Sequence, residues 1–80
     1  MSPREITHTR SPEGSTSHED ITHVQGVDAD GIEFVEPIDQ VVQNIKAGQY
    51  YYIVVMGITL KVAYYQSPEG RYFIKTIPAT

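Results

Sequence analysis

Apolar residues recur with the period of a helix in one stretch of the chain. The stripe consists of four aliphatic residues spaced i, i+3, i+4 and i+7, namely Ile38, Val41, Val42 and Ile45. Pro37 suits the first helical position, because the N–H that proline lacks would be unpaired there. Gly48 favours termination in a left-handed conformation. The pattern therefore predicts a helix over about residues 37–47.

The period drops to two after Gly48. Residues 50–55 and 58–66 read as strands joined by the two-residue loop Met56-Gly57, and a loop of that length pairs Val55 with Ile58. The turn at residues 67–70 then sets Tyr64 opposite Ile74 and Val62 opposite Thr76. This register gathers one apolar face, on which the helix stripe should pack: Tyr51, Ile53, Val55, Ile58, Leu60, Val62, Tyr64 and Ile74.

The first half of the chain contains two similar β-branched runs, residues 5–9 and 20–24, which both include Ile-Thr-His and fit short strands. Residues 11–20 carry no apolar side chain and read as a flexible loop, while residues 1–3 are expected to be disordered. A turn at Asp28-Ala29-Asp30-Gly31 precedes a short extended segment, residues 32–35. We therefore predict a single α+β domain over residues 1–80, with a small, twisted, mainly antiparallel sheet and one helix packed on one face.

The order of these segments resembles a family of short bacterial and archaeal proteins catalogued only as a domain of unknown function. The resemblance extends from about Glu5 to Pro78 and is carried by five segments: the first Ile-Thr-His, Ile21-Thr22-His23-Val24, the helix end Asn44-Ile45-Lys46-Ala47-Gly48, the strands around Gly57, and Arg71-Tyr72-Phe73-Ile74-Lys75-Thr76-Ile77-Pro78. Met56 departs from it, because a small or polar turn residue is commoner there, and so does Ala79, where an acidic residue is expected. The resemblance implies a compact α+β unit and supplies no catalytic residues.

Composition and charge narrow the range of functions. The chain has no cysteine and a net charge of −4, which excludes disulfides and thiolate metal sites and disfavours bulk binding to nucleic acid or anionic membranes. The charge is uneven: residues 1–39 hold nine acids and two arginines, whereas residues 40–80 hold four cations and Glu69 as their only acid. No apolar run approaches the ~20 residues of a membrane span, and no signal peptide is recognisable, so we expect a soluble cytoplasmic protein without membrane contact.

Candidate chemistry in the sequence is sparse. His8 and His23 would lie side by side if the two Ile-Thr-His strands paired, but zinc would need a third and usually a fourth ligand, such as His18. An alignment of Gly31 with the glycine of a calcium loop leaves Pro37 where the bidentate Glu should stand. The chain lacks a nucleophile motif and a glycine-rich phosphate loop. We therefore predict no catalytic residues, no metal site and no cofactor.

The second face of the predicted hairpins is unusual for a solvated surface, because aromatic residues and cations alternate there without a carboxylate. The residues that we expect to contact a partner are Tyr52, Lys61, Tyr65, Arg71 and Phe73. Such a composition suits a protein interface, in which aromatic residues and arginine are enriched, or a sheet that stacks single-stranded bases. Residues 4–10 and 21–27 are a third candidate, since they would simply cover the face. We predict a non-enzymatic protein-interaction module that binds a protein partner or forms a homodimer, with single-stranded nucleic-acid binding as the alternative.

Overall fold

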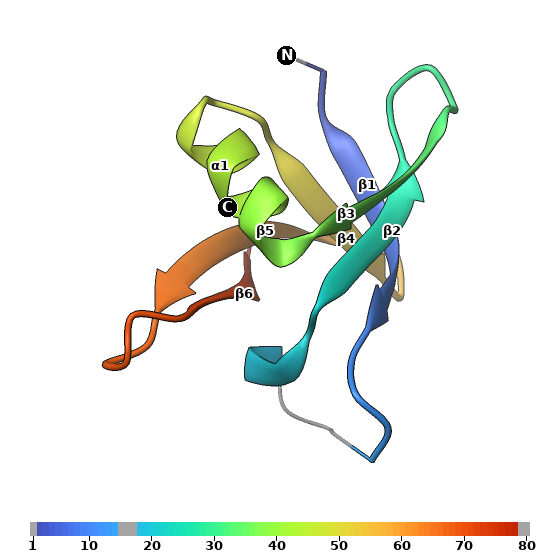
Figure 1. Ribbon diagram of the computed structural model, residues 1–80. Coiled ribbons are helices and arrows are strands. Elements are labelled where there is room, and N and C mark those ends of the chain that lie inside the picture. Colours follow the sequence, from blue (N-terminus) through green and yellow to red (C-terminus); the bar gives the residue numbers. More distant parts are fainter. Residues whose placement is uncertain (1, 15–17, 79–80) are drawn as a thin grey trace.

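The computed structural model describes residues 2–14 and 18–78, which form one six-stranded sheet, one α-helix and a short 3-10 helix (Figure 1). The elements are, in chain order, β1 (Arg4–Arg10), the 3-10 helix (His18–Asp20), β2 (His23–Val27), β3 (Glu33–Pro37), α1 (Ile38–Lys46), β4 (Tyr51–Val55), β5 (Ile58–Gln66) and β6 (Tyr72–Pro78). The strand order is β3-β2-β1-β4-β5-β6, and every neighbouring pair is antiparallel except β1 and β4, which are parallel. The predicted α+β class is thus confirmed.

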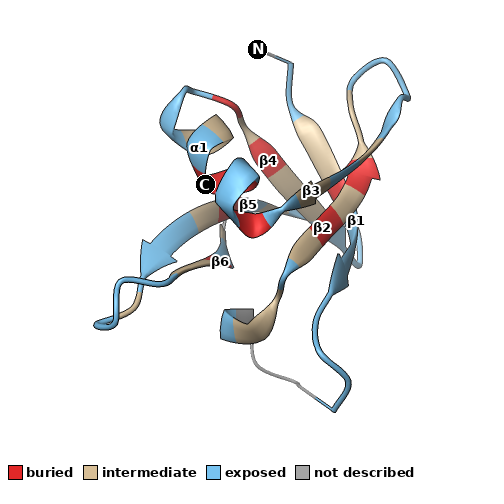
Figure 2. Ribbon diagram, viewed as in Figure 1, coloured by how far each residue is buried: buried red, intermediate tan, exposed pale blue. Residues whose placement is uncertain are grey.

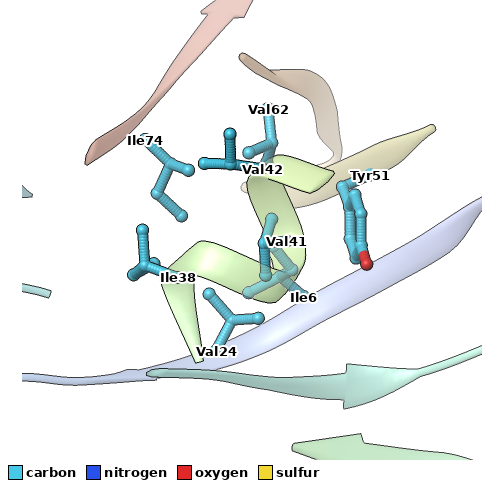
Figure 3. Packing of buried hydrophobic residues seen from close by; sticks show 8 residues of the cluster. All are labelled: Ile6, Val24, Ile38, Val41, Val42, Tyr51, Val62 and Ile74. Carbon is cyan, nitrogen blue, oxygen red and sulfur yellow. The ribbon is translucent and has the colours of Figure 1, made fainter. Parts of the chain in front are cut away.

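The core lies on the inner side of a coiled sheet. Val24 of β2 and Ile74 of β6 belong to the same buried cluster, although four strand spacings, about 19 Å in a flat sheet, separate their strands. The sheet must therefore coil to bring its two ends together, and the 3-10 helix contacts β6 across the gap. The buried positions are distributed over five of the six strands and the helix (Figure 2). Figure 3 shows the cluster: Ile6, Val24, Ile38, Val41, Val42, Tyr51, Val62 and Ile74.

Helix α1 presents its predicted apolar stripe to this core. Ile38, Val41 and Val42 are buried and Ile45 packs against them. Pro37 has an extended conformation (φ −69°, ψ 156°) and immediately precedes the helix. The helix thus begins at Ile38, one residue after the predicted start at Pro37. The helix ends in a Schellman arrangement, in which the N–H of Gly48 (φ 101°) donates to Ile45 and that of Gln49 donates to Asn44. The periodicity therefore located this element to within a residue at either end.

The β4–β5 and β5–β6 pairs have the register that the loop lengths predict. Val55 faces Ile58 across a turn in which Met56 and Gly57 both have positive φ (51° and 79°), as a type I′ hairpin requires. After the second turn Tyr64 faces Ile74, and Val62 faces Thr76. The apolar face is therefore continuous across three strands. Its outer end differs from the prediction, because Val55 and Ile58 are exposed and α1 does not cover them.

The N-terminal strands differ from the prediction in their position along the sequence. The second strand runs over His23–Val27 rather than residues 20–24, and the third over Glu33–Pro37 rather than residues 32–35. Part of the predicted loop, His18–Asp20, forms the 3-10 helix, while residue 1 and residues 15–17 lie outside the described residues. The predicted turn at Asp28 is confirmed, since its carboxylate accepts hydrogen bonds from the N–H groups of Asp30 and Ile32 at 2.9 and 3.0 Å.

A bulge in β1 sets how the two Ile-Thr-His segments meet. The register shifts between Ile6, which faces Gly26, and His8, which faces Gln25. His23 faces Arg10, so the two strands pair without placing His8 and His23 opposite each other. Gly26 sits where the two backbones approach closely: a Cβ atom there would lie 1.8 Å from the Glu5 carbonyl oxygen. The bulge and this glycine together fix the register of β1 on β2.

Candidate functional site

The outer side of β4, β5 and β6 carries the aromatic and basic residues that the sequence groups together. Side chains alternate between the two sides of a strand, and the register places Tyr52 beside Lys61, Ala63 beside Lys75 and Tyr65 beside Phe73. We name the resulting surface the aromatic–lysine face and define it by six residues: Tyr50, Tyr52, Lys61, Tyr65, Phe73 and Lys75.

The aromatic–lysine face is organised by contacts between rings and ammonium groups. The rings of Tyr65 and Phe73 stack with centroids 5.8 Å apart and an interplanar angle of 23°. The Lys75 ammonium lies 5.5 and 5.6 Å from their centroids. At the other end, the Lys61 ammonium lies 5.9 Å from the centroid of Tyr50. Each lysine is thus within reach of a cation–π contact, which places both positive charges among apolar rings.

The described N-terminal strands do not cover this face. β1 and β2 continue the sheet beyond β4 as its next strands, so residues 4–10 and 23–27 lie beside the face rather than over it. Lys61 and Lys75 are exposed, 39% of the Tyr65 surface is exposed to solvent, and Tyr52 and Phe73 are partly exposed. The suggestion that these segments simply cover the face is therefore wrong.

Arg71 stands apart from the other predicted partner-binding residues. Its guanidinium lies 3.9 Å from the carboxylate of Asp20 in the 3-10 helix. Together with Phe73 and three acidic residues, Glu19, Asp20 and Glu69, it lines a hollow at the margin of the face. The structure therefore brings Tyr52, Lys61, Tyr65 and Phe73 onto one face but pairs Arg71 with an acid.

Two residues of the face were left out of the predicted set of partner-binding residues. Lys75 contacts both stacked rings, and Tyr50 lies with its ring centroid 6.3 Å from that of Tyr52. The sequence indicates the place of Lys75, because side chains alternate between the two sides of a strand. Lys75 follows Phe73 by two residues and therefore lies on the same side of β6 as Phe73.

A second polar cluster lies on the inner side, where it joins four elements. Glu36 accepts a hydrogen bond from the Tyr51 hydroxyl (2.7 Å) and another from the Asn44 amide (2.9 Å). Arg4 contacts both oxygens of the same carboxylate at 3.3 Å and stacks on the Phe34 ring at 5.3 Å. Because these polar groups bond to one another, the cluster serves to tie β1, β3, α1 and β4 together.

This inner cluster predicts a specific response to alkaline pH. Burial raises the pKa of the Tyr51 hydroxyl above its usual value of 10.0, and the neighbouring Glu36 carboxylate adds to this, while the Asn44 hydrogen bond opposes it. The unfolded chain then loses this proton more readily than the folded protein. The stability that Tyr51 contributes is therefore complete below about pH 10 and is lost as the pH rises from there through the folded pKa.

We expect the difference in unfolding free energy between the wild type and Tyr51→Phe to shrink above pH 10. Urea unfolding of both proteins at several pH values between about 8 and 11 measures this difference. The raised pKa of Lys46, caused first by its hydrogen bond to Tyr72 (3.0 Å), cancels because both proteins contain it. A difference that stays constant across this range would show that the Tyr51 pKa is not raised.

The described side chains provide no metal centre around His8 or His23. Within residues 2–14 and 18–78, no group of three His, Asp, Glu or Cys side chains is arranged to hold a metal ion. The Nδ1 atoms of His8 and His23 instead lie 3.0 Å from the hydroxyls of Thr7 and Thr22, their neighbours in the chain. Thr7 also donates to the Gln25 carbonyl, so this contact belongs to the pairing of β1 with β2.

Comparison of the chain with family models, curated proteins and solved structures finds no match. The resemblance to a family of unknown function therefore stays a prediction. None of the described helices has the length and apolar character needed to cross a bilayer.

Proposed function

We propose that this protein is a non-enzymatic protein-interaction module that binds its partner through the aromatic–lysine face. The observation that carries the proposal is the placement of Lys61 beside the Tyr50 ring and of Lys75 over the Tyr65 and Phe73 rings, on strands that contain no Asp or Glu. Tyrosine and phenylalanine supply apolar contact area with few rotatable bonds, which makes them frequent anchors of interfaces.

The charge of the face favours an acidic partner. A carboxylate that approaches Lys75 meets an ammonium group over two rings, and one that approaches Lys61 meets an ammonium group beside one ring, so the ion pair would form with less water around it than on an open surface. A twofold dimer through the same face would instead bring the lysines of two copies together without a carboxylate on these strands. We therefore propose a different protein with acidic and apolar residues, rather than a second copy, as the partner of this face.

Binding of single-stranded nucleic acid is the second candidate function. The stacked pair Tyr65–Phe73 with Lys75 above it combines rings for bases with a cation for phosphate. Two features count against it. Arg71 shares its charge with Asp20, and Glu5 lies beside Tyr52 in the parallel ladder, so acids stand at both margins of the face. Few phosphates could be neutralised there, whereas strong binding to single strands requires many.

The substitution Tyr65→Glu tests this proposal, with Tyr64→Glu as its matched control. The two tyrosines are consecutive and similarly exposed, but Tyr64 faces the other side of the sheet, where its ring lies 5.7 Å from the Lys46 ammonium. We expect a peptide library displayed on phage and selected on the wild type to yield acidic sequences that contain aromatic or aliphatic residues. Tyr65→Glu should weaken their binding at least ~10-fold, which corresponds to about 1.4 kcal/mol, whereas Tyr64→Glu should change it little.

The nucleic-acid alternative is tested on the same proteins with a single-stranded oligonucleotide of mixed sequence at two salt concentrations. The proposal expects little binding at physiological salt. Binding that falls steeply with salt and disappears in Tyr65→Glu would replace the proposal by the second candidate. Selected peptides that bind Tyr65→Glu as well as the wild type would show that the partner surface lies elsewhere.

A further inference from the structure

The tip of the β4–β5 hairpin breaks two local rules at one position. Met56 is 96% exposed and adopts a positive φ of 51°, a conformation that suits glycine or asparagine and costs most other residues free energy. Val55 and Ile58 beside it are 47% and 62% exposed. An apolar, strained tip of this kind favours folding less than Asn-Gly would, so a role in binding is a better explanation for it.

An apolar groove opens on the inner side of the sheet, next to the same hairpin. Its volume is about 330 Å³, and Ile21, Ile53, Val62 and Ile74 line it, with Thr9 and Thr76 also at its wall. Lys75 contributes as well, but its ammonium lies over the Tyr65 and Phe73 rings on the outer side. The groove is therefore apolar and lies within the size range of ligand sites.

The tip and the groove belong to one continuous apolar surface. The inner side of the β4–β5 hairpin runs from the buried Tyr51 and Val62, through the partly buried pair Ile53–Leu60, to the exposed pair Val55–Ile58. Ile53 and Val62 are also walls of the groove. The projecting tip thus adjoins the groove on the same side of the molecule.

We propose that this surface binds a second copy of the chain, with the tip of each copy inserted into the groove of the other. Because tip and groove adjoin each other, a single twofold axis places each tip in the groove of the other copy. Both tips and both grooves are then occupied, so the dimer does not associate further through them. The tip carries no charge, and the ammonium of Lys75, the one charged residue of the groove lining, lies over rings on the outer side, so an inserted tip meets an uncharged wall. In each copy the tip leaves Val55, Met56 and Ile58 exposed to 47%, 96% and 62%, and this apolar surface is what the groove of the other copy would cover. This interface is separate from the aromatic–lysine face, which stays accessible in such a dimer.

The substitution Met56→Asn separates self-association from folding. Asparagine tolerates the left-handed conformation, so the variant should be at least as stable as the wild type in urea unfolding. Light scattering over a range of protein concentrations should show the wild type passing from one chain to two, with Met56→Asn requiring at least ~10-fold higher concentration. Ile32→Asn is the matched control, since Ile32 is 63% exposed in the turn before β3, and it should dimerise like the wild type.

A second variant, Thr9→Phe, closes the groove from its exposed margin and should also prevent dimer formation while the tip is intact. A wild type that stays monomeric at every concentration, or a dimer that Met56→Asn leaves unchanged, would overturn the proposal.

The fluorescent probe anilinonaphthalene sulfonate tests a small apolar ligand as the occupant instead. Tight binding to a monomeric wild type that Thr9→Phe abolishes and Met56→Asn does not affect would assign the groove to such a ligand and overturn self-association. Tyr65→Glu should leave the dimer intact, so failure of this proposal and failure of the proposed function can be told apart.

Discussion

The substitution Gly26→Ala is expected to lower the free energy of unfolding by more than ~3 kcal/mol. A Cβ at this position would lie 1.8 Å from the carbonyl oxygen of Glu5 and 2.8 Å from its carbonyl carbon, and both atoms belong to the backbone. Relief of this overlap requires β1 and β2 to separate. β1 is also the link to β4, so the damage reaches the centre of the sheet. For a chain of 80 residues the total stability is on the order of 4–12 kcal/mol, so a loss of this size removes between about a quarter and three quarters of it.

The control for this prediction is Gly31→Ala, which makes the same change where a Cβ meets no atom within 4 Å. Gly31 has a φ of 81°, so alanine there should cost only the ~1–2 kcal/mol of a left-handed conformation. Urea unfolding followed by circular dichroism measures both variants. If Gly26→Ala proves no more costly than Gly31→Ala, β1 and β2 do not approach each other as described.

Removal of the Glu36 carboxylate is the second change with a large expected effect. Glu36→Ala deprives the buried Tyr51 hydroxyl, the Asn44 amide and the Arg4 guanidinium of a common acceptor. The Tyr51 hydroxyl would lose its acceptor, the Asn44 amide would keep only its hydrogen bond to that hydroxyl, and Arg4 would lose its counter-charge. Together these losses should lower the unfolding free energy by about 2–4 kcal/mol. Glu36→Gln keeps an acceptor for the Tyr51 hydroxyl and should cost about half as much.

Glu33→Ala is the matched control, because Glu33 lies on the same strand and is exposed. Its unfolding free energy should change by less than ~0.5 kcal/mol, as is usual for surface positions. Equal effects of Glu36→Ala and Glu33→Ala in urea unfolding would contradict the role of the inner cluster as a tie between elements.

Local patterns predicted the second half of the fold well. The helix stripe starting at Ile38 and the two-residue loop at Met56-Gly57 involve contacts between residues close in sequence, so period and loop length determine them. Long-range pairing leaves no such local trace. The parallel contact of Arg4 with Tyr51 joins strands 47 positions apart, and no alternation of residues reports it. The bulge after Ile6 likewise shifted the partner of His8 to Gln25.

The candidate site was predictable to the extent that it depends on alternation within hairpins. Tyr52, Lys61, Tyr65 and Phe73 share a face because the register of adjacent strands requires it. The pairing of Arg71 with Asp20 depends on how far the sheet coils, which brings the 3-10 helix to β6. The sequence did not predict the inner cluster either, because it joins residues of β1, β3, α1 and β4 that are distant along the chain.

The measurement that tests the central claim most directly is a map of amide chemical-shift changes in the isotopically labelled protein, recorded while a peptide selected on the wild type is added. If the aromatic–lysine face is the binding surface, the largest changes will fall on the outer positions of β4 to β6, above all Tyr52, Lys61, Tyr65, Phe73 and Lys75. Changes centred instead on the hairpin tip at Met56 or on the inner cluster around Glu36 would contradict the claim.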